Sequence, residues 1–243
     1  MTSSSTSPEN LTALANVSRN GRSLAKGAPH SALVMLADPH SPAAEAYRSL
    51  AANLQFAYAD RQLRTIGITS AAAGEGKSTT VANLAIALAE GGRRVIVIDA
   101  DLRRPGLHTL FGVDGQEGLA TVLLNDHAQL PLLDTPAPGV RLLPSGSMPG
   151  NPLEALASRR FEQVLALARA QADFVLVDTA PAGALADAAV LAPRVEGILL
   201  VVSAGRTKRD LARRAREQLE RVNANVLGVV LTDVRGDDKL YKY

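Results

Sequence analysis

The stretch Arg64–Asp101, RTIGITSAAAGEGKSTTVANLAIALAEGGRRVIVIDAD, decides the predicted fold. Apolar residues rich in Ile and Val predict one strand at 64–70 and a second at 94–101. Between them, the run at 78–92 predicts a helix that is closed by Gly91-Gly92. A strand, a helix and a second strand in this order form a βαβ unit, in which the two strands run parallel.

The rest of the chain continues this alternation. Further strands are predicted at 140–143, 173–179, 197–203 and 226–234, and further helices at 153–171, 184–192 and 208–223. The strands are continuous runs of Val, Ile and Leu, which is the pattern of strands covered by helices on both faces. We therefore predict an α/β fold with a doubly wound, mostly parallel β-sheet flanked by helices.

Composition narrows the function classes. The 243 residues are 47% hydrophobic and 21% charged, carry a formal net charge of +2 and include no cysteine. The lack of cysteine excludes disulfides and thiolate metal sites, and no apolar run approaches the length that spans a bilayer. The near-neutral charge gives no reason to expect a nucleic acid partner. These features predict a cytoplasmic protein.

The chain divides into three parts. Residues 1–29 are rich in Ser, Thr, Asn and Gly and predict a disordered leader. Residues 30–235 predict one domain, which begins with an amphipathic helix at 42–59. Residues 236–243, GDDKLYKY, form a charged tail. A chain terminus of this composition is flexible by default.

A glycine-rich loop, SAAAGEGKSTT at 70–80, joins the first predicted strand to the first predicted helix. In this context backbone N–H groups at a helix N-terminus wrap phosphate groups. The loop matches the end of the P-loop pattern G-x-x-x-x-G-K-[ST], although Ala71 stands at its first Gly position. We expect Lys77 to reach the β and γ phosphates and the Ser78 hydroxyl to bind Mg²⁺. The residues predicted to bind nucleotide in this loop are Gly74, Glu75, Gly76, Lys77, Ser78 and Thr79.

Carboxylates follow two other buried strands. Asp178 ends one of them, where an unpaired carboxylate is costly, so it either binds a cation beside Ser78 or caps a helix. Asp99 and Asp101 end another strand, and residues two apart point to the same side. Both therefore face the phosphates. One takes a proton from an attacking hydroxyl or orients water, the other completes the Mg²⁺ shell, and Arg103 offsets negative charge on the nucleotide.

Together these motifs resemble the bacterial tyrosine kinases (BY-kinases) of capsule and exopolysaccharide synthesis, within the deviant Walker group of P-loop ATPases. The resemblance covers about residues 42–243. In that family a Walker A loop, a second acidic motif called Walker A′ and a Walker B motif replace the eukaryotic kinase machinery. DLRRPGLHTLFGVDGQEGLATVL at 101–123 and LLPSGSMPGNPLEALAS at 142–158 are similar to two further segments of the family.

The resemblance implies ATP and Mg²⁺ as cofactors of a protein tyrosine kinase that regulates polysaccharide polymerisation or export. It places Lys77 on the phosphates, Ser78 and Asp178 on Mg²⁺, and the Walker A′ pair Asp99 and Asp101 in catalysis, with the choice of base left open. Kinases of the family are activated by a membrane adaptor, either fused or separate, and the lack of a spanning segment implies a separate one. The same resemblance implies that the chain forms a homo-oligomer and has a phosphatase as a partner. It also implies a location near the membrane.

Tyr241 and Tyr243 match the location of the family's tyrosine-rich tail, which neighbouring subunits phosphorylate in trans. The chain has only 4 tyrosines, and two of them lie in its last three residues. The family tail commonly carries a longer cluster, so phosphorylation at many sites is not expected here. The alternative is an exposed terminus without function.

The helix at 42–59 resembles the family's oligomerisation helix, whose motif is E-x-x-R-x-x-R. Glu45 and Arg48 match this motif, but Ala51 stands where the second Arg is expected. The change removes a fork of donors that would bind a neighbour's carboxylate. We expect a ring that is weakened or uses other contacts, or else a helix that packs as a lid on its own domain.

Two other functions are compatible with these residues. A Min/Par-type ATPase shares the nucleotide motifs and uses nucleotide to switch dimerisation, but its early loop lysine is absent from residues 70–73. A nucleotide-binding scaffold that docks an adaptor without phosphoryl transfer is the other alternative. The best support for the Min/Par-type ATPase is the basic stretch GRTKRDLARRARE at 205–217. It predicts a solvated face, or else a surface for an acidic partner or tail, or for DNA.

Overall fold

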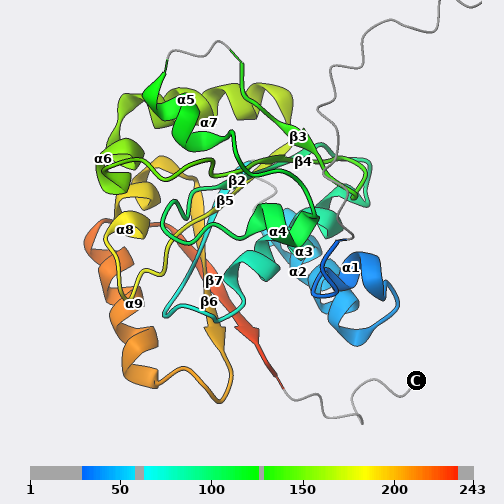
Figure 1. Ribbon diagram of the computed structural model, residues 1–243. Helices are drawn as coiled ribbons and strands as arrows, with labels where there is room; N and C mark the ends of the chain where they lie inside the picture. The colour runs from blue at the N-terminus through cyan, green and yellow to red at the C-terminus, as the bar shows by residue number, and fades with distance from the viewer. Residues whose placement is uncertain (1–28, 58–62, 126–128, 235–243) are drawn as a thin grey trace, which may run out of the picture.

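The computed structural model describes residues 29–57, 63–125 and 129–234 (Figure 1). The predicted tail, with Tyr241 and Tyr243, lies outside the described residues, and so does the predicted leader except for its last residue. What the sequence predicts for these two segments therefore stays a prediction.

The described strands form one seven-stranded sheet in the order β3-β4-β2-β5-β1-β6-β7. Neighbouring strands are parallel throughout, except for the short strand β3, which runs antiparallel to β4. The predicted α/β fold with a mostly parallel sheet is confirmed. The strands are β1 (Thr65–Ser70), β2 (Val95–Asp99), β3 (Leu133–Asp134), β4 (Val140–Leu143), β5 (Phe174–Asp178), β6 (Gly197–Ser203) and β7 (Val226–Thr232).

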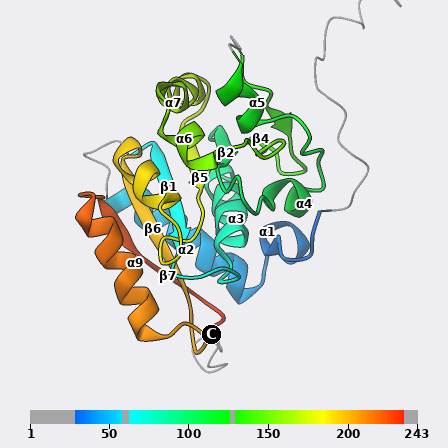
Figure 2. The ribbon, with the colours of Figure 1, turned by 60° about the vertical axis from the view of Figure 1, so that its left-hand side comes forward.

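Helices cover both faces of this sheet, as Figures 1 and 2 show. Alternate residues of one strand enter opposite layers, so that Val95 and Val97 of β2 pack on one side while Ile96 and Ile98 pack on the other. Burial on both faces explains why the strands have continuous apolar sequences. One layer holds α1 (Val34–Ala37), α2 (Pro42–Ala57), α3 (Lys77–Ala89) and α4 (Leu107–Phe111), and the other holds α5 (Leu119–Leu124), α6 (Pro152–Ala157), α7 (Arg159–Gln171), α8 (Asp187–Leu191) and α9 (Arg209–Arg221).

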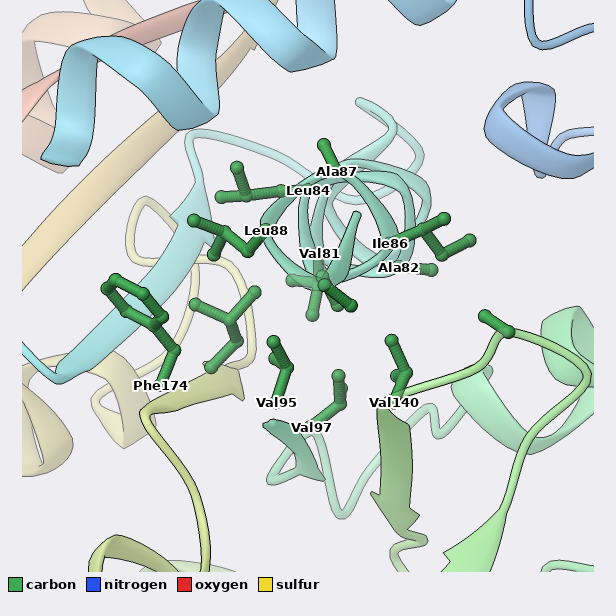
Figure 3. Packing of buried hydrophobic residues seen from close by; sticks show 14 of the residues in the cluster. Val81, Ala82, Leu84, Ile86, Ala87, Leu88, Val95, Val97, Val140 and Phe174 are labelled. Atoms are coloured by element: carbon green, nitrogen blue, oxygen red, sulfur yellow. The ribbon is translucent and has the colours of Figure 1, made fainter. Parts of the chain in front are cut away.

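The helix α3, which follows the glycine-rich loop, is buried on nearly all sides. Figure 3 shows Val81 and Leu88 pointing at strand residues such as Val95 and Phe174, while Ala87 lies on the far side of the helix. α2 packs against α3 on this far side, so Ala87 is only 8% exposed. A helix that is apolar all round has to be covered on all sides. The glycine-rich loop is therefore anchored to a helix that is buried in the core.

The amphipathic helix predicted at 42–59 is confirmed over Pro42–Ala57 as α2, and residues 58 and 59 lie outside the described residues. Its residues Ala44, Ala51 and Leu54 are buried in the same apolar cluster as α3. The interpretation of this helix as a lid packed on its own domain therefore agrees with the packing. Ala51 is 3% exposed, so the position where the family carries an Arg is a core position here.

Two predicted helices have different bounds in the structure. The helix predicted at 153–171 is two helices, because the backbone of Ser158 is extended (φ −68°, ψ 153°) and α7 begins directly after it. The helix predicted at 184–192 is shortened to α8, and a 3₁₀ turn, Ala192–Arg194, follows it. Both differences come from local backbone turns that apolar periodicity does not report. The short elements α1, α4, α5 and β3 were not predicted.

The prediction that every strand is buried on both faces is wrong for β7. Val229 is 57% and Leu231 is 60% exposed. β7 lies at the edge of the sheet and pairs only with β6 among the described strands. α9 runs alongside β6 and β7 in Figure 2 and packs mainly with α8 and the inner residues Ile198 and Leu200 of β6. An apolar sequence alone does not separate an edge strand from a central one.

Candidate active site

The predicted site residues meet at the carboxyl ends of three central strands. β5 lies between β2 and β1, and the register pairs Asp178 with Asp99 on one side and with Ile68 on the other. The loop that follows β1 and the acidic segment that follows β2 therefore emerge at the same edge of the sheet. This is the edge where open parallel sheets bind their ligands.

The glycine-rich loop has the backbone shape that its glycines predict. Gly74 (φ +77°) and Gly76 (φ +83°) both take left-handed conformations, which residues with a Cβ seldom adopt. Lys77, the first residue of α3, follows directly, so the loop opens onto a helix N-terminus. A cleft of about 730 Å³ lies in front of it, and its lining includes Gly74, Gly76, Lys77, Ser78 and Thr79.

Part of the cleft lining comes from a segment to which the sequence analysis assigned no role in the site. Pro181, Ala184 and Leu185, which follow β5, line the cleft together with the loop. Gly183 makes this approach possible, because a Cβ at that position would lie 2.1 Å from the carbonyl oxygen of Ala71. Gly183 was the one feature of this segment's sequence from which the close approach could have been predicted.

Lys77 and Ser78 line the cleft, and both are hydrogen-bonded to Asp178, which does not line it. Lys77 Nζ lies 2.5 Å from Asp178 Oδ1, and Ser78 Oγ donates to Asp178 Oδ2 at 2.6 Å. Asp178 is fully buried. The predicted placement of Asp178 beside Ser78 is thus observed, and both oxygens of the carboxylate have partners. Both side-chain hydrogen bonds of Asp178 come from side chains and not from a helix backbone N–H, so they give no support to the alternative that Asp178 caps a helix.

The two carboxylates after β2 differ in their surroundings. Asp101 lines the cleft, and its Oδ2 lies 3.4 Å from Lys77 Nζ. Asp99 is fully buried behind it, and its Oδ2 accepts N–H groups of Gly106 and Leu107 at the start of α4. Asp99 Oδ1 is also buried and has no hydrogen-bond partner among the described residues. The sequence predicted that both carboxylates face the phosphates, but only Asp101 reaches the cleft.

The site carries more buried negative than positive charge. The three carboxylates of Asp99, Asp101 and Asp178 surround the single ammonium of Lys77. Burial, together with repulsion from Asp178, raises the pKa of Asp99 to about 7. Burial opposes the charge of Lys77, but attraction to Asp178 and Asp101 outweighs it and raises the pKa of the ammonium. A further cation would relieve this imbalance.

The donor set suits a hard cation such as Mg²⁺. A hydroxyl and carboxylates are oxygen ligands, which Mg²⁺ prefers. Among the described residues no group of three or more His, Cys, Asp or Glu side chains could hold a metal by itself. Mg²⁺ in nucleotide sites takes only one or two protein ligands and completes its shell with phosphate oxygens and water. The residues present therefore fit a metal that arrives with a nucleotide.

Arg103 is held by a partner that the sequence did not indicate. Its guanidinium donates to both carboxylate oxygens of Asp187, at 2.7 and 3.2 Å. Asp187, the first residue of α8, is 2% exposed. Arg103 also lines the cleft, next to Arg104. The ion pair joins the segment after β2 to the segment after β5 across the rim of the cleft.

Glu75 differs from the other loop residues because its side chain turns away from the cleft. It is 5% exposed, does not line the cleft, and accepts hydrogen bonds from Ala72 N and Thr207 Oγ1. The prediction that Glu75 binds nucleotide therefore has no geometric support from its side chain. Thr207 was part of the basic stretch in the sequence and had no assigned role.

The predicted oligomerisation residues make contacts within their own chain. Arg48 donates from Nε and Nη2 to both oxygens of Glu90, at 2.7 and 2.8 Å, and from Nη1 to the carbonyl of Pro39 at 2.8 Å. Glu45 lies 3.5 Å from the same guanidinium, and its side chain is 64% exposed. Arg48 thus fastens α2 to the end of α3. The predicted role in oligomerisation stays a prediction.

The basic stretch forms the start of α9 and its preceding loop. Arg213 pairs with Asp210 and Glu217, and Arg216 pairs with Glu220, one turn away along the helix. Ion pairs of this spacing are typical of a solvent-exposed helix face. Their presence favours the interpretation of this surface as a solvated one.

Comparison with known proteins identifies the family to which the chain belongs. Residues 66–242 match the family model of the CobQ/CobB/MinD/ParA nucleotide binding domain. Over 200 residues, which are 82% of this chain and 84% of the relative, the sequence is 38% identical to the tyrosine-protein kinase YwqD of Bacillus subtilis. The chain belongs to the bacterial tyrosine kinases of capsule and exopolysaccharide synthesis. It covers only 26% of another BY-kinase, the tyrosine-protein kinase ptk of Acinetobacter johnsonii, to which it is 33% identical.

Solved structures agree with this assignment. The kinase domain of the Escherichia coli tyrosine kinase ETK has a TM-score of 0.79 at 31% identity, and the match covers 93% of this BY-kinase and 88% of that chain. MinD of Pyrococcus horikoshii, complexed with Mg-ADP, has a TM-score of 0.58 at 27% identity, with 69% of each chain covered. The BY-kinase thus shares the P-loop ATPase fold of MinD but is closer in structure to a kinase domain. No helix in the described part of the chain is long and apolar enough to cross a membrane.

Proposed function

We propose that this chain is an Mg²⁺- and ATP-dependent protein tyrosine kinase that phosphorylates Tyr241 and Tyr243 in the tail of another copy of itself. The observation that carries the proposal is the position of Asp101. Its carboxylate lines the same cleft as Lys77 and Ser78 and comes from the Walker A′ segment. A carboxylate at this place can take the proton of an attacking hydroxyl, which nucleotide binding alone does not require.

The proposal assigns roles to the charged and hydroxyl groups around Lys77. Lys77 and the backbone N–H groups of the glycine-rich loop bind the β and γ phosphates. Ser78 and Asp178, which are hydrogen-bonded to each other, would hold Mg²⁺. When bound, Mg²⁺ offsets charge on the phosphate oxygens. Asp99 stays behind Asp101 and fixes the start of α4 through its bonds to Gly106 and Leu107.

Phosphoryl transfer from ATP to tyrosine involves one bond made and one bond broken. The tyrosine hydroxyl oxygen bonds to the γ-phosphorus, the bond from that phosphorus to the β–γ bridging oxygen breaks, and ADP leaves. The hydroxyl proton passes to Asp101, because this carboxylate lines the cleft while Asp99 is sealed from it. Arg103, held by Asp187 at the rim, adds positive charge beside the incoming substrate.

The cellular role is proposed from the family. A membrane adaptor activates the kinase at the cytoplasmic face of the membrane, a phosphatase reverses the modification, and the cycle regulates polymerisation or export of a polysaccharide. Further copies of the chain supply the tails for transfer in trans. The higher likeness to the ETK kinase domain than to MinD supports this role over a nucleotide-driven dimerisation switch.

Phosphotyrosine mapping by mass spectrometry tests the proposal. The full chain is isolated from its native host, where an adaptor is available, and compared with Lys77→Met. We expect phosphotyrosine at Tyr241 or Tyr243 that disappears in this variant. Lys208→Met is the matched control, because Lys208 is exposed and lies outside the cleft lining, so this variant should keep the modification.

Three results would decide against an autokinase. A chain that is well expressed but never carries phosphotyrosine in its tail contradicts the proposal and promotes the switch ATPase, provided that it hydrolyses ATP. If it neither hydrolyses ATP nor carries phosphotyrosine, the scaffold alternative gains support. Phosphotyrosine that persists in Lys77→Met assigns the modification to another kinase.

A further inference from the structure

Glu75 is a carboxylate placed in the middle of a loop that binds phosphate. An anionic side chain between Gly74 and Gly76 would repel the ligand if it faced the cleft, and it would also compete for the backbone N–H groups that wrap phosphates. In the structure the side chain is 5% exposed and lies on the side of the loop away from the cleft. Its position therefore needs an explanation other than contact with nucleotide.

The carboxylate is held by one backbone and one side-chain donor. Glu75 Oε2 accepts the N–H of Ala72 at 2.9 Å, which closes the first half of the loop. Glu75 Oε1 accepts the hydroxyl of Thr207, in the segment between β6 and α9. The Thr207 oxygen itself accepts the N–H of Ser203 at 3.0 Å, so its only proton is free to go to Glu75. Both carboxylate oxygens are thus used.

A second bond ties the same residue to the end of the sheet. The hydroxyl of Thr232, the last residue of β7, donates to the carbonyl oxygen of Glu75 at 2.8 Å. Thr232 also lies close to Gly76, since a Cβ added to Gly76 would be 3.3 Å from the methyl group of Thr232. Glu75 is therefore fastened by its side chain to Thr207 and by its backbone to Thr232.

We infer that Glu75 is a positioning residue: with Thr207 and Thr232 it forms a brace that holds the glycine-rich loop in its phosphate-binding shape. The brace acts on Gly74 and Gly76, whose left-handed conformations are otherwise only two among many that glycine can adopt. A loop that is already shaped binds its ligand without the entropic cost of ordering. The inference rests on the nucleotide site of the proposed function but not on transfer to tyrosine.

The dissociation constant of Mg-ADP for the full chain tests the brace, because this binding does not require kinase activity. Thr207→Val removes the hydroxyl and keeps the shape of the side chain, and we expect it to weaken Mg-ADP binding by roughly tenfold, the typical effect of losing a hydrogen bond to a charged group. Thr207→Ser keeps the hydroxyl and should restore affinity to within about twofold. Binding is measured at a temperature at which the unfolding curve of each variant shows it to be folded.

Thr65→Val is the matched control. Thr65 lies at the start of β1, is fully buried, and its hydroxyl has no hydrogen-bond partner among the described residues. The same chemical change should leave Mg-ADP affinity unaltered there. Thr232→Val, at the half-exposed edge strand, removes the other tie with little risk to folding and should weaken binding in the same direction as Thr207→Val.

The possible results separate this inference from the proposed function. Unchanged Mg-ADP affinity in both Thr207→Val and Thr232→Val overturns the brace, even if their unfolding midpoints fall. A loss of affinity in Thr207→Val that Thr207→Ser does not restore also contradicts it. If the unaltered chain binds no Mg-ADP, the nucleotide site of the proposed function fails instead. A chain that binds Mg-ADP but lacks phosphotyrosine leaves the brace intact and removes only the kinase proposal.

Discussion

Two clusters of charged residues differ in almost every respect except their prominence in the sequence. The first cluster surrounds Lys77 at the carboxyl ends of β2 and β5, and the Lys77 side chain is 8% exposed. It contains three carboxylates and one ammonium. The second joins Arg48 of α2 to Glu90 and Glu45 on the surface, where the side chains are 30 to 64% exposed. Both were predicted as functional from motifs.

The contrast shows that burial, more than the number of ion pairs, marks the reactive site. The surface cluster is balanced by solvent and by its own hydrogen bonds, so it has no need of a ligand. The buried cluster has an excess of negative charge, an Asp99 oxygen without a hydrogen-bond partner in the described part of the chain, and an adjoining cleft. Unpaired charge in a buried place is costly, and a bound cation would offset that cost.

The largest expected effect comes from removing the only ammonium of the buried cluster. Lys77→Met should lower the free energy of unfolding at pH 8 by about 3–5 kcal/mol, because it leaves buried carboxylates without a counter-charge. The loss should shrink at pH 5, where these carboxylates can take up protons. Urea unfolding at the two pH values measures both effects. Equal losses at pH 5 and pH 8 would show that lost packing of the lysine stem is responsible.

The next effect concerns the pH dependence that Asp99 contributes. The pKa of this carboxyl is about 7 in the native state and near its ordinary value of 3.8 in the unfolded chain. Between these values the native state binds more protons, so stability falls as the pH rises through this window. Asp99→Asn removes the charge and should gain on the order of 2–4 kcal/mol relative to the unaltered chain between pH 4 and pH 8.

Unfolding of both chains across that pH range checks this prediction. Asparagine keeps an acceptor for the N–H groups of Gly106 and Leu107, so the start of α4 should survive the change. Asp173→Asn is a control of opposite sign, because hydrogen bonds from Arg94 lower the pKa of Asp173. A difference between Asp99→Asn and the unaltered chain that does not depend on pH would refute the assignment.

A smaller effect is expected at the rim of the cleft. Asp187→Asn removes the charge of a buried carboxylate that pairs with Arg103, whose side chain is 37% exposed. Solvent screening at the guanidinium limits the coupling between the two to about 1 kcal/mol or less. A double-mutant cycle with Arg103→Met measures it from unfolding free energies. A KM for ATP that rises in Asp187→Asn with unchanged kcat would indicate that the pair shapes the cleft for binding.

The smallest effect is expected for the surface cluster. Arg48→Met, which parallels Lys77→Met in chemistry, should shift the unfolding midpoint by at most a few degrees, and less at high salt, because exposed ion pairs are screened. A midpoint that falls as far as that of Lys77→Met would remove the contrast between the clusters. Light scattering on the same variant tests the predicted oligomerisation role, which requires that the assembly changes when Arg48 or Glu45 is replaced.

Much of the fold was predictable because it follows from local patterns. Continuous apolar runs located the central strands, and Gly91-Gly92 marked the end of α3 to within two residues. The break at Ser158 and the exposed face of β7 were missed, since the first is a single extended residue and the second depends on which strands become neighbours. Sequence period cannot report either property.

The sequence by itself determined which chemical groups the site contains and that parallel strands would bring them to one edge. Lys77, Ser78, Asp101 and Asp178 were identified because motif spacing is a local property of the chain. Only the tertiary structure decided which carboxylate faces the cleft, that Asp187 holds Arg103, and that Glu75 turns away toward Thr207 and Thr232. Glu75 and Thr232 are 157 residues apart. Contacts of this kind depend on how layers pack, and no local pattern encodes them.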